Sequence, residues 1–94
     1  MSYLLVRHQV ADYARWKPVF DAHGAVRKAS GAKGARIFRN ARDPKEILVL
    51  VEWDDLEKAR QFIESGDSRQ VRQRAGVADT PDVYFLEEIE QSRA

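Results

Sequence analysis

Lys45–Trp53, with the sequence KEILVLVEW, is the stretch that decides the fold. Its last seven residues carry a single charge, at Glu52, and contain no glycine or proline. A continuous run of Ile, Val and Leu of this length is typical of a central strand that is buried on both faces. The stretch therefore predicts a sheet that needs apolar cover on both of its sides.

Length and composition restrict the class of protein. The chain has 94 residues, no cysteine and a net charge of +1. We expect one domain over residues 1–94, which as a monomer would bury only about 60–65% of its unfolded surface. The sequence offers no disulfide or zinc-thiolate framework and no strong basic field for nucleic acid. The first apolar run is broken by Arg7 and His8, so we expect a cytoplasmic protein with no membrane partner. The small net charge predicts no nucleic-acid partner.

Three further strands are expected, and turn residues at 41–44 join the second and third strands into a hairpin. These strands are Tyr3–Val10, Gly34–Asn40 and Val83–Ile89.

Two helical segments separate the strands. The first follows an N-cap at Asp12, and Gly31 ends it. Pro18 allows two arrangements, because the helix either kinks there or has its main part begin near Lys17.

The second helical segment is expected to begin after Asp54, because Glu57 follows three residues later as in a capping box. It runs to about Ser65, and a short helical piece is expected over Ser68–Ala75. Arg69, Arg72 and Arg74 are expected on a solvated face of that piece.

The resulting order β-α-β-β-α-β predicts an α+β, ferredoxin-like fold, with a four-stranded antiparallel sheet and both helices on one face. The helices can cover one face only, whereas Leu48 and Leu50 make the opposite face of the central strand apolar. We expect a second copy of the chain to cover that face. Two sheets would then pack face to face as an isologous homodimer, a dimeric α/β barrel.

Several motifs resemble those of the dimeric α/β-barrel superfamily, and within it the antibiotic-biosynthesis-monooxygenase-like group. The resemblance covers nearly the whole chain, although its motifs specify architecture better than chemistry. They are Arg-His-x-Val at residues 7–10, Asp-Tyr-x-x-Trp-Lys-Pro-x-Phe at 12–20, Val-Glu-Trp-Asp-Asp-Leu at 51–56, Ala-Gly-Val at 75–77 with a proline at 81, and Phe-Leu-Glu at 85–87.

The resemblance implies a cleft between the sheet and the helices that holds a small aromatic or polyketide-like molecule. It also implies a cofactor-independent monooxygenase or a cyclase, with Trp53 at a position that lines the cleft in such proteins. Haem-degrading relatives pair that Trp with an Asn on the first strand and a His after the second helix. Here His8 is on the first strand and no His follows the second helix, so haem degradation is not expected.

His8 is the candidate catalytic residue, because an imidazole titrates near neutrality and can act as a general base. The alternative for each of the two histidines of the chain is a structural position in the core or at its rim. A shift of one residue in the register would place Arg7 in the cleft instead. His23 is a candidate ligand-binding residue on the apolar stripe of the first helix. No third ligand stands near the two histidines at a recognisable spacing, so no metal site is predicted.

Trp16, Phe20 and Trp53 are candidate ligand-binding residues, although aromatic residues in such positions are more often core, and a wide aromatic-lined cleft would serve both purposes. Arg27 either extends to solvent or holds a substrate carboxylate or phenolate at the mouth of the cleft. The alternative function is a non-catalytic homodimer that binds a metabolite or another protein. That alternative predicts a cleft filled by the three aromatic rings.

Overall fold

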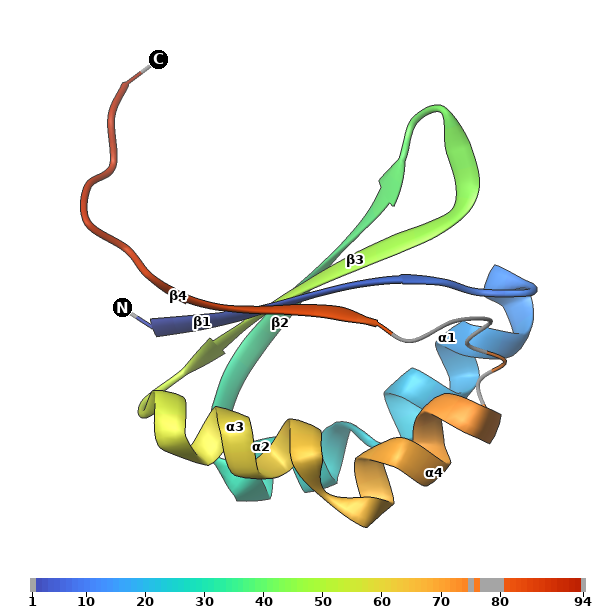
Figure 1. Ribbon diagram of the computed structural model, residues 1–94, viewed down its shortest axis with the longest axis horizontal. Helices are drawn as coiled ribbons and strands as arrows, with labels where there is room; N and C mark the ends of the chain where they lie inside the picture. Colours follow the sequence, from blue (N-terminus) through green and yellow to red (C-terminus); the bar gives the residue numbers. More distant parts are fainter. Residues whose placement is uncertain (1, 75, 77–80, 94) are drawn as a thin grey trace.

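The computed structural model describes residues 2–74, 76 and 81–93 (Figure 1). The strands are β1 (Ser2–Gln9), β2 (Ala32–Asn40), β3 (Asp43–Trp53) and β4 (Asp82–Glu87). The helices are α1 (Tyr13–Ala22), α2 (Gly24–Ser30), α3 (Leu56–Glu64) and α4 (Gly66–Arg74).

The four strands form one antiparallel sheet in the order β2-β3-β1-β4. Figure 1 shows all the labelled helices on one side of this sheet. The predicted α+β, ferredoxin-like architecture is therefore confirmed. Among the described residues, none of the helices combines the length and the apolar content that a membrane span requires.

Strand β3 lies between β1 and β2, as its sequence predicts. Its alternate residues Ile47, Val49, Val51 and Trp53 are each at most 4% exposed and face the helices. Leu48 and Leu50 lie on the opposite face, because successive side chains of a strand point to opposite sides. The apolar run thus supplies both faces of the sheet, and the helices cover one of them.

Strand β1 is in the register that places His8 on the inner face. His8 pairs with Ile47 and is 5% exposed. Arg7 points to the outer face, where its guanidinium donates to Glu46 at 2.8 Å and to Asp82 at 2.9 Å. These two ion pairs give Arg7 partners on both neighbouring strands, so the register with Arg7 in the cleft is excluded.

The first helical segment begins at Tyr13, because the Asp12 side chain accepts a hydrogen bond from the Ala14 N–H at 3.0 Å. Pro18 lies inside α1, and the interruption comes only at His23, between α1 and α2. The main helix therefore does not begin near Lys17, and the chain bends later than the proline suggests.

Gly31 ends α2 in the left-handed conformation with φ 117°, as predicted for a glycine cap. Strand β2 begins at Ala32, two residues before the predicted start. Gly34, the predicted first residue of this strand, lies within β2 at a shift of register against β3.

The N-cap predicted at Asp54 is wrong. Asp55 caps α3, because its side chain accepts a hydrogen bond from the Glu57 N–H at 2.8 Å. Asp54 instead forms an ion pair with Lys33 at 2.8 Å, which links the end of β3 to β2. The sequence offers two adjacent aspartates, and in the structure Asp55 takes the cap while Asp54 pairs with β2.

The later elements differ from their predicted bounds at their ends. Ser65 is the C-cap of α3, as expected, and α4 begins directly after it, at Gly66. Ala75, the predicted end of this helical piece, lies outside the described residues. Strand β4 ends at Glu87, because its pairing with β1 ends opposite Ser2.

Replacing Asp55 by Ala is expected to lower the free energy of unfolding by about 1 kcal/mol, because the Glu57 N–H loses its acceptor. Asp54→Ala is the matched control and should cost less, since it removes only an exposed ion pair. Urea unfolding at one fixed protein concentration measures both. A larger loss for Asp54→Ala than for Asp55→Ala would show that the cap is assigned to the wrong residue.

Candidate functional site

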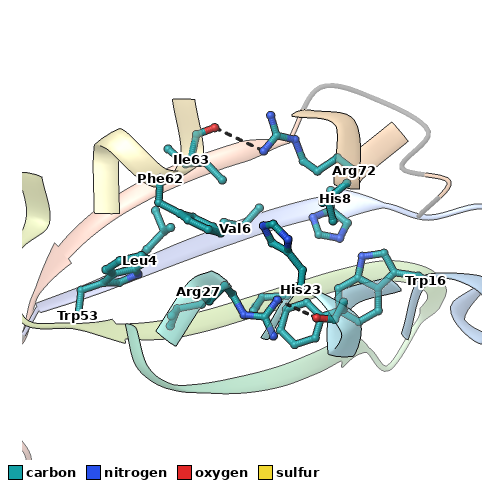
Figure 2. Close-up of a pocket in the computed structure, with 14 residues that line it drawn as sticks. Leu4, Val6, His8, Trp16, His23, Arg27, Trp53, Phe62, Ile63 and Arg72 are labelled. Carbon is teal, nitrogen blue, oxygen red and sulfur yellow. Dashed lines mark hydrogen bonds between the residues drawn. The ribbon is translucent and has the colours of Figure 1, made fainter. Parts of the chain in front are cut away.

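A cavity lies between the inner face of the sheet and the helices (Figure 2). Strands β1 and β3 form one wall, and side chains from all the labelled helices form the other. Its volume is about 80 Å³, counted as space for the centres of water-sized molecules. On this measure one water molecule needs about 10–15 Å³, so the cavity has room for part of a small ligand. The cavity-lining surface is almost entirely apolar.

His8 enters the cavity from β1. The alternation of the strand turns it inward together with Leu4 and Val6, and the fold leaves it 5% exposed. Its ring centroid is 5.7 Å from that of Trp16 on α1. Trp16 in turn stacks on Phe20, with 4.9 Å between the ring centroids and 23° between the ring planes. The predicted catalytic histidine therefore borders an aromatic wall built by α1.

A second aromatic group lines the cavity between β3 and the α1–α2 junction. His23, at the interruption between these helices, has its ring centroid 5.6 Å from that of Phe62 on α3. The Phe62 centroid is 5.5 Å from that of Trp53, at the end of β3. Two aromatic groups thus bound the cavity, one around Trp16 and one around Phe62.

Trp53 carries a buried hydrogen-bond donor. The residue is 2% exposed, and its indole Nε1 has no hydrogen-bond partner within the described part of the chain. A buried donor without an acceptor costs about 1–3 kcal/mol. Because Trp53 lines the cavity, a carbonyl or carboxylate oxygen of a bound ligand is a suitable acceptor.

Arg27 reaches the cavity from α2 and is half-buried. Its Nη1 donates to the carbonyl of Phe20 at 2.8 Å, and its guanidinium carbon lies 3.6 Å from the centroid of the Phe20 ring. Burial lowers the pKa of the Arg27 guanidinium from its usual value, and the charge of Asp21 offsets part of this effect. The guanidinium nonetheless remains charged at neutral pH.

Arg72 is a cavity residue that sequence reasoning assigned to a solvated face, and that prediction is wrong for this residue. Arg72 is half-buried on α4, and its Nη1 donates to the carbonyl of Ile63 at 3.5 Å. Burial lowers the pKa of Arg72, and the positive charge of Arg69 lowers it further. Arg69 and Arg74 are exposed, as predicted.

One signal in the sequence marks the inner side of α4. Val71 is the only Val, Leu, Ile, Met or aromatic residue between Gly66 and Arg74, and it lines the cavity beside Arg72. A single apolar residue does not define a helical stripe, so the pattern alone could not decide which arginine turns inward.

The structure brings together around one cavity all the residues that the sequence analysis proposed for the site. The aromatic rings line the cavity rather than fill it, contrary to the alternative that predicted a filled cleft. Within the described part of the chain, no cluster of three His, Asp or Glu side chains could hold a metal ion. The catalytic and ligand-binding roles stay predictions. The residues proposed for the site, all of which line the cavity, are His8, Trp16, Phe20, His23, Arg27 and Trp53.

Comparisons with known proteins find similarity at the level of structure. No protein-family model matches the sequence, and no curated protein sequence matches it. A candidate antibiotic biosynthesis monooxygenase from Bordetella bronchiseptica superposes with a TM-score of 0.81 at 16% identity, over 95% of this chain and 97% of the other. A second candidate from Caulobacter crescentus superposes with a TM-score of 0.73 at 17% identity, over 95% and 90% of the two chains.

SnoaB, a cofactor-independent oxygenase from Streptomyces nogalater, is also similar. Its TM-score is 0.76 at 13% identity, and the match covers 96% of this chain and 94% of SnoaB. Identities this low establish a shared fold and leave the activity of this chain to be tested. The chain therefore has the ferredoxin-like fold of the antibiotic-biosynthesis-monooxygenase structures.

Proposed function

We propose that the protein is a cytoplasmic homodimer that binds a small aromatic or polyketide-like molecule in the helix–sheet cavity. We propose further that it oxidises this molecule as a cofactor-independent monooxygenase. The observation that carries the proposal is the burial of His8 in an apolar, aromatic-lined cavity. The fold shared with SnoaB supports the oxygenase reaction over other reactions of a buried base.

The cavity walls suit a planar aromatic ligand. Trp16 and Phe20 lie on one side, and Phe62 and Trp53 lie on another. Aromatic rings gain from offset-stacked and edge-to-face contacts in addition to the area they bury. Pockets of this kind use apolar walls for affinity and a few polar groups for orientation.

His8 would act as the general base. It would take a proton from a phenol or an activated carbon of the ligand, which leaves an electron-rich anion. That anion would transfer one electron to dioxygen, and the resulting radical and superoxide would combine to a peroxide. Loss of water then gives the quinone. For an anthrone the sum is anthrone plus dioxygen to anthraquinone plus water, and neither a metal nor a flavin enters the scheme. In a cyclase the same base would only move a proton.

The outer face of the sheet supports the homodimer. The pairing register places Leu5 between Leu50 and Tyr84 on this face. Phe38 is 49% exposed, Tyr84 is 51% exposed and Leu86 is 38% exposed. Figure 1 shows no labelled helix on this side of the sheet. A contiguous apolar surface of this kind marks an interaction site, and an isologous pair of sheets would cover it.

The rim of the same face is polar. Arg7 bridges Glu46 and Asp82, and Gln9 donates to Asp43 at 3.1 Å. An apolar centre with a polar rim is the usual composition of a protein–protein interface.

The double variant Phe38→Lys/Tyr84→Lys is expected to weaken dimerisation by about 100-fold or more, because it buries two charges in the proposed interface. Both side chains are about half exposed in one subunit, so the subunit itself should tolerate lysine. Val26→Lys, at a 43% exposed position on α2, is the matched control and should leave the dimer intact. Sedimentation equilibrium measures the dissociation constant. A wild-type protein that stays monomeric at high concentration would contradict the homodimer.

Replacing His8 by Ala is expected to lower the rate of oxygen consumption with an anthrone by about 100-fold or more, because the general base is lost. His23→Ala is the control, and it should raise the substrate concentration at half-maximal rate more than it lowers the maximal rate. An oxygen electrode records both, after subtraction of spontaneous oxidation. Equal rates for His8→Ala and wild type would remove His8 from the mechanism. Binding without any oxygen consumption would favour the non-catalytic binding module.

A further inference from the structure

Two positive charges border the cavity. Figure 2 shows Arg27 and Arg72 approaching it from opposite sides, the first from α2 and the second from α4. None of the described residues that line the cavity is an aspartate or a glutamate. His8 and His23 are the other titratable side chains of the lining, so the two guanidinium groups supply the fixed positive charges at the cavity.

Arg27 is held in place and retains donors for a ligand. The Phe20 carbonyl accepts from Nη1, and the Phe20 ring supports the guanidinium face at 3.6 Å. A guanidinium has five N–H donors in a rigid fork, so one carbonyl occupies only a part of its capacity. A group that is oriented before the ligand arrives loses little side-chain entropy on binding.

Arg72 is held more loosely. Its hydrogen bond to the Ile63 carbonyl is 3.5 Å long, at the outer limit for an N–H···O contact. Little free energy is lost if Nη1 turns from this carbonyl to a carboxylate, because the present bond is long and weak, whereas a guanidinium and a carboxylate can form two short parallel hydrogen bonds. The half-buried position shields such a pair from water and salt.

We infer that the ligand is an aromatic acid, whose carboxylate or phenolate is a different group from the carbon or phenol that His8 deprotonates, and that Arg72 acts together with Arg27 to select it by charge. This inference rests on the proposed function, which places an aromatic ligand in the same cavity. The aromatic part would lie between the rings of Trp16 and Phe62, and the anionic group would point toward the space between the Arg27 and Arg72 guanidinium groups. The buried Nε1 of Trp53 offers a further donor for an oxygen of such a ligand.

Charge selection also fits the proposed chemistry. Abstraction of a proton by His8 would leave a negative charge on the ligand, and fixed cations nearby would stabilise that charge without reorganisation. A neutral ligand would leave both half-buried guanidinium groups without a counter-charge in the cavity. The structure therefore favours an acid or an acidic phenol over a neutral aromatic molecule.

Isothermal titration calorimetry on the full chain tests the inference with 2-naphthoate and its neutral analogue 2-naphthamide. We expect the wild type to bind the anion at least about tenfold more tightly than the amide. Arg72→Met and Arg27→Met, which keep length and apolar contact, should each remove most of that preference, measured as the ratio of the two dissociation constants within the same variant. Arg69→Met is the control on α4, because Arg69 is exposed, and it should keep the preference.

The outcomes separate the inference from the proposed function. Equal binding of both compounds by the wild type, or an unchanged preference in Arg72→Met, would overturn charge selection while the ligand site stands. Binding of neither compound would count against the aromatic ligand and would overturn the inference with it. Circular dichroism of each variant, recorded beside the titration, shows whether a loss of binding comes from loss of the fold.

Discussion

Packing of the inner face of β3 against the helical layer is the interaction on which the rest of the structure depends. Ile47, Val49 and Val51 are almost fully buried there, and each contributes about 1.5–3 kcal/mol through removal of its side chain from water. The same strand alternation places Trp53 inside, at the edge of the cavity. Because β3 lies between β1 and β2, its position also determines which residues of those strands face the helices.

The helical layer that covers the cavity is interrupted twice. One interruption, at His23, separates α1 from α2, and another, at Ser65, separates α3 from α4. Figure 1 shows these short helices as separate pieces along the sheet. A continuous helix would keep one stripe towards the strands, whereas interrupted helices let polar side chains enter between them. His23 lies at one interruption, and Arg72 belongs to the helix that follows the other.

Local sequence determined the elements and most of the candidate site. The apolar run of Lys45–Trp53 predicts the central strand, and Gly31 predicts the end of a helix because only glycine adopts a left-handed cap without strain. The alternation of β1 groups His8 with apolar neighbours, and a helical period groups Trp16 with Phe20. These patterns are short-range, so the chain displays them before any tertiary contact forms.

Tertiary structure decided what depends on contacts between distant residues. Pairing of β1 with β3 and β4 sets the register that turns His8 inward and places Arg7 beside Glu46 and Asp82, and a register cannot be obtained from one strand alone. Asp54 pairs with Lys33, and its neighbour Asp55 caps α3. The inward position of the α4 arginine required the docking of that helix beside α1 and α3. A helix with a single apolar residue carries no stripe that specifies its orientation, so only its packing partners do.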